Sequence, residues 1–431
     1  MQKGLISIDR WSEKSQAYFL THLHADHTEG LSPHWSGGPI FCSPISARLF
    51  PCKFPGFDLS LLRVLEVGRT HPLSLSSPTN GSEVQILVTP IDAHHCPGAV
   101  MYLFRGEFGC VLYTGDFRWE LKSERAKLAK KTLLDALQGD KVNNLYLDNT
   151  YCHPSFSFPP REVAAQQVVD IITQHPNHEI VVGIDTLGKE GLLLHISQAL
   201  STKIWVWPER LQTMHLLGFD NIFTTKTSLT RVRAVPRYSL TFETLEALNT
   251  IHPTIGIMPS GLPWGLKSPK VDDTFGTSLE NCCECKGSAT SRIQLETNQI
   301  QPPRKLHRYA YSVPYSEHSC FTEIEEFVKI IKPSVVTGIV SSSFYYINPR
   351  HYFGYLCGFG HLFHKPCRNF RCEKAKNAEV NQCQSFPRCR SSNKLKERKE
   401  GSIKFASFSV RSSRLSAIRK GKCGVKIMEI D

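Results

Sequence analysis

The chain has 431 residues, of which 41% are hydrophobic, and it carries a formal net charge of +12. This length exceeds one average domain of about 100–200 residues, so we expect one elaborate catalytic unit or two interlocked units, followed by a tail. No apolar run approaches the roughly 18 residues that a membrane span requires, and the first nine residues lack the apolar core of a cleavable signal. We therefore expect a soluble protein with no membrane partner.

The positive charge is concentrated at one end of the chain. Residues 361–431 contain 18 Lys and Arg against 6 Asp and Glu, a net charge of +12 that equals that of the whole chain (51 against 39). Residues 1–360 therefore balance to neutrality. A basic segment predicts a polyanionic partner bound by salt-sensitive electrostatics, and a merely solubilising segment is the alternative. Because this segment has few apolar residues and no sustained period, we expect residues 361–431 to be a basic, disordered tail.

The fifteen cysteines are scattered and odd in number, which favours reduced thiols inside a cell over a disulfide framework. Two groups of them are close in sequence, and a structural zinc is the alternative that their lack of paired Cys-x-x-Cys spacing disfavours. These groups are Cys282, Cys283 and Cys285, and Cys367, Cys372, Cys383 and Cys389.

Residues 1–152 alternate short β-type runs with loops that are rich in turn residues. The runs are Ala17–Thr21, Gln85–Thr89, Ala99–Phe104, Cys110–Thr114 and Asn144–Leu147. This pattern predicts a sheet that carries functional loops at the ends of its strands.

Residues 153–305 change to alternating helical and strand patterns, which predict a separate parallel α/β unit. We expect helices at Arg161–Gln174, Leu192–Leu200 and Glu209–Leu217, and strands at Glu179–Ile184 and Ile204–Trp207. Residues 268–303 are polar and irregular, which predicts an exposed loop.

Residues 306–360 resume regular patterns and are expected to return to the core. Strands are predicted at Leu306–Val313 and Val335–Val340, on either side of a helix at Thr322–Ile331.

A cluster of potential metal ligands follows the first apolar run, in the order His22-Leu23-His24-Ala25-Asp26-His27. Imidazole nitrogens and carboxylate oxygens suit zinc in a hydrolytic site, whereas thiolates more often close a structural site. The alternative is a polar surface loop that happens to be rich in histidine. Four potential ligands within six residues favour the metal site.

Four ligands in one loop cannot enclose two ions, so the hypothesis requires distant partners at other strand ends. His94-His95-Cys96-Pro97-Gly98 precedes one predicted strand, and Thr114-Gly115-Asp116 ends the next. Asp116 has the chemistry of a carboxylate that bridges two cations about 3.5–4 Å apart. We expect zinc as the cofactor, as one or two divalent ions.

Six motifs in this order resemble one family, the metallo-β-lactamase enzymes with a β-CASP insertion, and within it the Artemis/Apollo group of DNA-repair nucleases. They span roughly residues 4–345 and comprise Ile8-Asp9-Arg10, the His-x-His-x-Asp-His loop, His95–Gly98, Leu112–Arg118, Leu147–Tyr151 and Pro314–Ser319. The resemblance implies an αββα sandwich of the metallo-β-lactamase type with an inserted β-CASP α/β domain.

The resemblance also implies roles for individual residues. The first metal would be held by His22, His24, His95 and Asp116, and the second by Asp26, His27 and Asp116. Asp9 would orient a ligand imidazole by accepting its other N–H. Asp148 and His318 match two β-CASP motifs and are expected, with Asp26, Asp116 and Asp9, among the catalytic residues. His94 competes with His95, but the family pattern places the ligand directly before Cys-Pro-Gly.

Substrate contacts are expected at four positions. Val340 aligns with the third β-CASP position, where valine is typical of the DNA-directed group and histidine of RNA-processing members; core packing is the alternative. Lys189 could meet a phosphate at a helix N-terminus, although such a lysine is more often solvated. Ser316 and His318 share one motif. His318 would stabilise the phosphate or help to protonate the leaving oxygen.

The function that the resemblance implies is DNA repair in the nucleus, of interstrand cross-links or double-strand breaks. We expect a 5′-to-3′ exonuclease that acts on DNA ends with a 5′-phosphate and leaves a 5′-phosphate and a 3′-hydroxyl. The alternatives are endonuclease action at DNA hairpins and overhangs, an RNA-processing endonuclease, a hydrolase of small thioesters or lactams, and a non-catalytic DNA-binding scaffold. The basic tail could bind repair proteins, and its Lys394–Lys399 run could direct nuclear import. The stretch Pro259–Trp264 differs from the Pro-Thr-Gly-Trp stretch of DNA-acting relatives. This difference concerns the contacts with DNA in the groove and leaves the metal ligands unaffected.

Overall fold

The computed structural model describes residues 4–12, 14–77, 80–120, 122–261, 302–340, 348–357 and 425–427. Most of the polar loop, both cysteine groups and the Lys394–Lys399 run lie outside these residues. Among the described helices, none has both the length and the apolar character needed to cross a membrane. The seven cysteines in the described ranges are free thiols.

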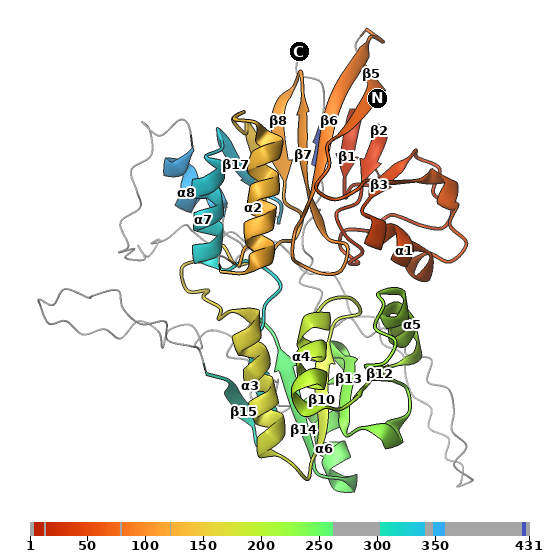
Figure 1. Ribbon diagram of the computed structural model, residues 1–431, viewed down its shortest axis with the longest axis vertical. Coiled ribbons are helices and arrows are strands. Elements are labelled where there is room, and N and C mark those ends of the chain that lie inside the picture. Colours follow the sequence, from red (N-terminus) through yellow and green to blue (C-terminus); the bar gives the residue numbers. More distant parts are fainter. Residues whose placement is uncertain are drawn as a thin grey trace, which may run out of the picture. The chain divides into compact units, whose positions relative to one another are not determined.

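Two sheets, built mainly from residues 4–147, pack face to face (Figure 1). The five-stranded sheet has the order β18-β1-β2-β3-β4, and the six-stranded sheet has the order β17-β9-β8-β7-β6-β5. The strands of the first sheet are β1 (Gly4–Ile8), β2 (Ser15–Phe19), β3 (Ile40–Cys42), β4 (Leu62–Val64) and β18 (Val425–Ile427). Those of the second are β5 (His71–Ser76), β6 (Glu83–Asp92), β7 (Val100–Gly106), β8 (Gly109–Tyr113), β9 (Asn144–Leu147) and β17 (Val335–Gly338).

The core between these sheets is built from alternating apolar residues, as expected when one strand face is buried. Phe19 of β2 lies against Phe104 of β7 with ring centroids 4.9 Å apart, and both are fully buried. In β6 the buried residues Val84, Ile86 and Val88 alternate with exposed ones. The hydrophobic pattern therefore fixes which face of each strand points inward.

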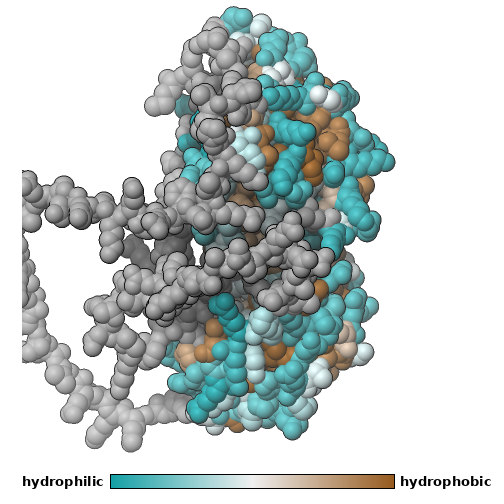
Figure 2. Space-filling view, turned by 90° about the vertical axis from the view of Figure 1, so that its left-hand side faces the viewer, coloured by the Kyte–Doolittle hydropathy of each residue, from teal (hydrophilic) through white to brown (hydrophobic). Residues whose placement is uncertain are grey.

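Helices cover the outer faces of the sandwich (Figure 1). Leu133 of α2 (Glu124–Leu137) and Phe327 of α7 (Phe321–Ile331) share an apolar cluster with Leu112 of the six-stranded sheet. Phe50 of α1 (Pro44–Lys53) lies in the same cluster beside Ile40 of β3. The described surface in Figure 2 is mainly hydrophilic, with smaller apolar areas. The two stacked sheets with helices on their outer faces confirm the expected αββα sandwich.

A third sheet of seven strands forms the inserted α/β unit, in the order β12-β11-β13-β10-β14-β16-β15. Its strands are parallel except for β15, which pairs antiparallel with β16. They are β10 (Glu179–Ile184), β11 (Ile204–Trp205), β12 (Phe223–Thr224), β13 (Val232–Pro236), β14 (Thr254–Pro259), β15 (Arg304–His307) and β16 (Ala310–Val313).

Helices flank both faces of this third sheet. In β10, Ile180 and Val182 point into a cluster with helices α3 (Arg161–Gln174), α4 (Glu190–Leu200) and α5 (Pro208–Leu216). Val181 points the other way and packs with Leu245 of α6 (Phe242–Ile251). Because parallel strands end at the same edge, the loops after β10, β13 and β14 share one edge of the sheet.

The predicted elements of residues 153–260 are confirmed; α3 and β10 have the predicted bounds, and the other three differ by one or two residues at one or both ends. The predicted single strand Leu306–Val313 is wrong. Residues 308–309 turn the chain, so β15 and β16 form a hairpin at the edge of the third sheet. The chain thus returns to the sandwich after Val313, through α7 and β17. The short helix α8 (Pro349–Phe353) follows.

The expected disorder of residues 361–431 is wrong for a short segment near the end. Strand β18 pairs antiparallel with β1, with Ile6 opposite Ile427. In the sequence, Val425 and Ile427 flank Lys426, a two-residue period that suits a strand. An unpaired edge at β1 would expose backbone donors and acceptors, and β18 satisfies them.

Candidate metal centre

The metal-ligand loop begins where β2 ends and is held in place through its backbone. The indole of Trp11 donates a hydrogen bond to the carbonyl oxygen of His27 (2.9 Å), and the hydroxyl of Thr28 donates to that of His24 (2.9 Å). Trp11 thus ties the loop to the segment before β2, Thr28 closes the loop on itself, and the histidine side chains turn inward.

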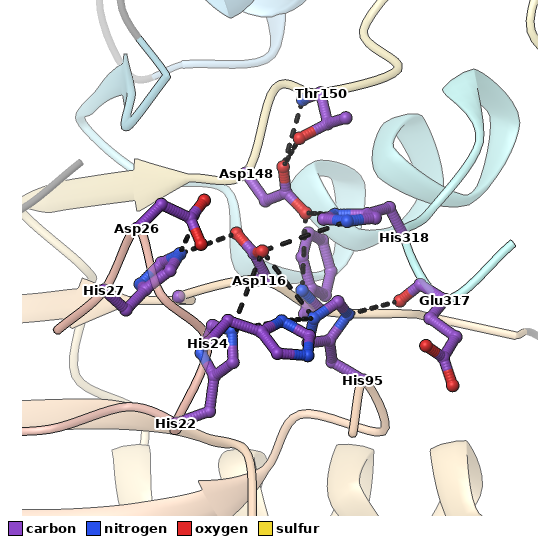
Figure 3. A network of polar contacts seen from close by, with 12 residues as sticks. His22, His24, Asp26, His27, His95, Asp116, Asp148, Thr150, Glu317 and His318 are labelled. Carbon is purple, nitrogen blue, oxygen red and sulfur yellow. Dashed lines mark hydrogen bonds and ion pairs between the residues drawn. The ribbon is translucent and has the colours of Figure 1, made fainter. Parts of the chain in front are cut away.

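Three imidazoles from two loops converge on one point (Figure 3). His24 Nδ1 lies 3.0 Å from His22 Nε2 and 3.1 Å from His95 Nε2. Ligand nitrogens bound to a tetrahedral zinc at 2.0–2.1 Å lie about 3.3 Å apart, so this spacing suits one ion. His22, His24 and His95 also form one group with the Cys96 thiol, with all ligand atoms within 4.8 Å of one another.

The second nitrogen of each ring is bonded to the protein, which leaves the first one facing the centre. His22 Nδ1 contacts Thr21 Oγ1 (3.0 Å), and this hydroxyl donates in turn to Asp9 Oδ2 (2.6 Å). His24 Nε2 contacts the carbonyl oxygen of Leu187 (2.9 Å). His95 Nδ1 contacts the carbonyl oxygen of Glu317 (2.9 Å). Such acceptors fix the tautomer and orientation of metal-bound histidines.

His27 follows the same rule, with Asp9 as its acceptor. His27 Nδ1 lies 2.7 Å from Asp9 Oδ2, and its Nε2 lies 3.3 Å from Asp116 Oδ1. That Nε2 is buried and has no hydrogen-bond partner among the described residues. A buried ring nitrogen of this kind is what a bound cation would satisfy. Asp9 therefore lies where the sequence places a residue that orients a ligand.

Asp116 lies between the two groups of potential ligands. Its Oδ2 lies 3.8 Å from His22 Nε2 and 3.6 Å from His95 Nε2, while its Oδ1 faces His27. A carboxylate in this position can contact two ions at once. Asp26 lies farther out: its side chain is 31% exposed and its Oδ2 is 3.9 Å from His27 Nε2.

The electrostatics of the cluster favour neutral imidazoles in three of the four rings. Burial lowers the pKa of His22, His24 and His95, so these rings keep a lone pair for a metal. Burial also lowers the pKa of His27, but Asp116 and Asp9 outweigh it and hold that pKa well above its ordinary value. The donor types and spacing of the cluster fit zinc, and His22, His24 and His95 keep the lone pairs that zinc requires.

His318 lies beside the cluster and is held by Asp148 (Figure 3). His318 Nδ1 lies 2.8 Å from Asp148 Oδ2, and the other carboxylate oxygen accepts hydrogen bonds from the backbone N–H (3.0 Å) and hydroxyl (2.6 Å) of Thr150. His318 Nε2 faces Asp116 Oδ2 at 3.8 Å. Asp148 thus leaves the Nε2 atom of a half-buried imidazole aimed at the metal centre.

Three of the residues expected to contact the substrate are buried in the structure and contact other groups of the protein. Val340 is buried in the core between the two sheets, and Asn149 holds its backbone N–H and carbonyl oxygen. Ser316 is 4% exposed; its hydroxyl donates to the His318 carbonyl oxygen and accepts from its N–H. Lys189 is buried against Asp185. These contacts shape the loops beside the cluster.

The competing histidine turns away from the centre. His94 Nε2 lies 3.5 Å from Asp92 Oδ2, and His94 has a positive φ of 55°. This backbone twist sends two neighbouring rings in different directions, so His95 alone of the pair reaches the cluster.

Sequence reasoning missed four residues that position the site: Thr21, Arg118, Leu187 and Glu317. Thr21 and Glu317 each precede a predicted site histidine, which was the available signal. Arg118 stands in the Asp116 motif; it is fully buried, donates to the Ser316 carbonyl oxygen (2.8 Å) and pairs with Glu323 (2.8 Å). Leu187 acts through its backbone, for which the side chain gives no signal.

Comparison with protein families matches residues 219–343 to the DNA repair metallo-beta-lactamase family. This segment runs from the inserted unit through α7 and β17. It contains the loop that carries His318.

Several curated proteins are similar to this chain. The 5' exonuclease Apollo of Gallus gallus is 36% identical over 351 residues, which cover 80% of this chain and 64% of that protein. The DNA cross-link repair protein SNM1 of Arabidopsis thaliana is 34% identical, over 76% of this chain and 61% of its own length. The DNA cross-link repair 1A protein of Homo sapiens is 31% identical, over 76% and 28%. The chain spans between 52% and 64% of the length of the four Apollo relatives.

Proposed function

We propose that this chain belongs to the DNA repair metallo-β-lactamase family and is a metal-dependent DNA nuclease, specifically a zinc-dependent 5′-to-3′ exonuclease, because residues 219–343 match that family and the relatives are similar over 76–80% of the chain. Four of the similar proteins are named 5′ exonuclease Apollo, and others are named for DNA cross-link repair. The proposed reaction is hydrolysis of a phosphodiester bond in DNA.

One observation carries the proposal: four imidazoles present a ring nitrogen to a shared centre while a protein group holds the other nitrogen. The proposed ligands are His22, His24, His95 and Asp116 for one ion, and Asp26, His27 and Asp116 for a second. Divalent ions bound there would supply Lewis-acid stabilisation of phosphoryl charge and activation of water.

The protein groups around this centre have separate tasks. Asp9 and Thr21 orient His27 and His22. Asp148 holds His318 so that its Nε2 can donate a hydrogen bond to the scissile phosphate or a proton to the leaving oxygen. Asp9, Asp26, Asp116, Asp148 and His318 are therefore the proposed catalytic set, with Asp9 and Asp148 acting through the histidines that they hold.

The DNA preference of the site rests on the family relationship and on position 340. Val340 stands where RNA-processing members have a histidine. Its side chain is buried in the core, so this position offers no imidazole to the substrate, which would favour DNA. Ser316 would act by shaping the His318 loop. Lys189 would reach a 5′-phosphate after exchanging its contact with Asp185.

A direct assay separates this proposal from its alternatives. The purified protein is incubated with 5′-phosphorylated single-stranded DNA, RNA of the same sequence, a DNA hairpin and a small thioester. We expect chelator-sensitive release of nucleotides from the 5′ end of the DNA. Faster RNA cleavage would favour an RNA-processing enzyme, and hairpin opening would favour an endonuclease. Equal rates with and without chelator would reject the metal mechanism.

The cellular setting is proposed from the names of the relatives and from the tail. Repair of interstrand cross-links or double-strand breaks in the nucleus fits a DNA exonuclease that is similar to cross-link repair proteins. The basic residues 361–431 would contact DNA or repair proteins, and Lys394–Lys399 would direct import. Imaging a tagged chain with and without these basic side chains tests the import signal.

A further inference from the structure

The loop between β10 and α4 brings the inserted unit into contact with the metal cluster. Its residue Leu187 accepts a hydrogen bond from His24 Nε2 at 2.9 Å through its backbone carbonyl oxygen. His22, His27 and His95 are held by groups outside this unit, at Thr21, Asp9 and Glu317. The orientation of His24 therefore depends on where this loop lies.

Buried charged side chains hold the peptide groups around Leu187. Arg210 donates to the carbonyl oxygens of Thr186 and Gly188. Glu190 accepts from the N–H of Gly188 at 2.9 Å. With these groups occupied by fixed partners, the Leu187 carbonyl oxygen is left facing His24.

Glu317 holds the same loop from the other side. Its carboxylate accepts a hydrogen bond from the backbone N–H of Lys189 at 2.5 Å, and its Oε2 lies 4.0 Å from Lys189 Nζ. Gly188 and Lys189 have φ angles of 105° and 63°, a left-handed turn that brings the loop against the carboxylate. A Cβ atom at Gly188 would overlap Glu317 Oε2.

Glu317 also acts on a second ligand through its own backbone. Its carbonyl oxygen accepts from His95 Nδ1 at 2.9 Å. One residue thus contacts the imidazole of His95 directly and the loop that orients His24, and these two rings lie 3.1 Å apart at their inward nitrogens.

We infer that Glu317 is a positioning residue that couples the inserted unit to metal binding, by fixing the Leu187–Lys189 loop against His24. This inference rests on the metal site of the proposed function. A group of buried charged side chains that served only folding would not require a Glu317 carboxylate oxygen directed at the N–H of Lys189. It would also not require a glycine at position 188, where a side chain would collide with that carboxylate.

The test measures zinc binding, so it does not depend on cleavage of DNA. Metal-free protein is titrated with zinc in competition with a chromogenic chelator, for the parent chain and for Glu317→Ala, Glu317→Gln and Gly188→Ala. Loss of a group that orients a metal ligand typically weakens binding about 10–100-fold, and we expect this for Glu317→Ala and Gly188→Ala. Glu317→Gln keeps an oxygen that accepts from Lys189 N–H and should bind zinc nearly as the parent does.

A matched control removes a carboxylate from β10, at the end of this strand that is remote from the Leu187–Lys189 loop. Glu179 begins β10 and pairs with Arg233 at 3.0 Å, so Glu179→Ala should leave zinc affinity unchanged. Circular dichroism of each metal-free variant shows which are folded. Gly188→Ala probes the contact from the loop side if Glu317→Ala does not fold.

The outcomes separate this inference from the proposed function. Parent-like zinc affinity in folded Glu317→Ala and Gly188→Ala would overturn the inference alone. So would equal losses in Glu317→Gln and Glu317→Ala, because the amide retains the acceptor. A parent chain that binds no zinc would instead reject the metal site itself.

Discussion

Each histidine of the cluster has one ring nitrogen held by another group of the protein. The acceptors differ in kind: a hydroxyl for His22, a carboxylate for His27, and backbone carbonyl oxygens for His24 and His95. In every case the committed nitrogen is the one remote from the centre. Preset tautomers of this kind lower the reorganisation that metal binding requires.

At the residue scale, Asp116 offers the most direct test of the centre. Asp116→Asn would weaken contact with both ions, because one carboxylate faces the rings of both groups. A metal contributes several kcal/mol to the transition state, so we expect nuclease activity to fall on the order of 1,000-fold. The product ladder from end-labelled DNA and the bound zinc are measured together.

Asp92→Asn is the matched control, since this half-exposed carboxylate contacts His94 and Arg125 outside the cluster. It should cleave DNA as the parent does. Undiminished cleavage by Asp116→Asn would show that this carboxylate does not serve the reaction.

The pair Asp148 and His318 is predicted to act as one unit. His318→Ala should lower kcat by about 100- to 10,000-fold, the usual contribution of a proton-transfer group. Asp148→Ala acts through the same imidazole, so the double variant should lose no more than His318→Ala alone. Kinetic constants and zinc content are measured for all three; zinc content should stay constant, and additive losses in kcat would mean that the two side chains work separately.

At the element scale, local sequence patterns predicted the inserted unit well and its edge poorly. Helix α3 and strand β10 have strong apolar periods, and their bounds match the prediction. The β15–β16 hairpin was missed because the turn at Arg308-Tyr309 contains no glycine, proline or asparagine. In the site, the ligand motif was readable, whereas the Leu187 carbonyl oxygen depends on long-range folding that no local pattern encodes.

Helix α7 is predicted to depend on one buried ion pair for its attachment to the metal loops. Glu323 pairs with the fully buried guanidinium of Arg118 (2.8 Å) and caps its helix by accepting from the Cys320 N–H (2.9 Å). Glu323→Ala leaves that guanidinium without its carboxylate, which typically costs about 3–5 kcal/mol. Urea unfolding of the metal-free protein measures this loss.

Glu326 of the same helix supplies the control. It pairs with Lys329 at 2.7 Å where both side chains are about two-fifths exposed. Exposed ion pairs contribute about 0–1 kcal/mol to the free energy of unfolding, so Glu326→Ala should leave the midpoint of urea unfolding nearly unchanged. Equal losses from both variants would mean that the buried pair has no special role.

At the scale of the whole molecule, charge and catalysis are separated along the chain. The proposed metal centre lies within residues 1–360, which are neutral overall, while residues 361–431 carry the net +12. Strand β18 pairs with β1, so the chain returns to the sandwich near its end. Deleting the tail would therefore also remove an edge strand, and substitution is the cleaner way to test its charge.

Neutralising four basic residues of the tail is predicted to weaken DNA binding without slowing the chemical step. The variant replaces Lys394, Lys396, Arg398 and Lys399 with glutamine. Each contact with a single-strand phosphate contributes about 0.7 to the slope of log affinity against log salt, so four contacts would reduce its magnitude by about 3. We expect KM at low salt to rise and kcat to stay at the parent value, because the proposed role of these residues is to bind DNA and none of them belongs to the proposed catalytic set.

The same change of charge on helix α2 distinguishes specific contact from net charge. Arg125, Lys127, Lys130 and Lys131 are exposed there, and their replacement with glutamine lowers the net charge by the same four units. If long-range attraction alone draws DNA to the protein, both variants lose affinity equally. If the tail contacts phosphates, the tail variant alone loses salt dependence, and an unchanged slope in it would leave the basic residues with a solubilising role.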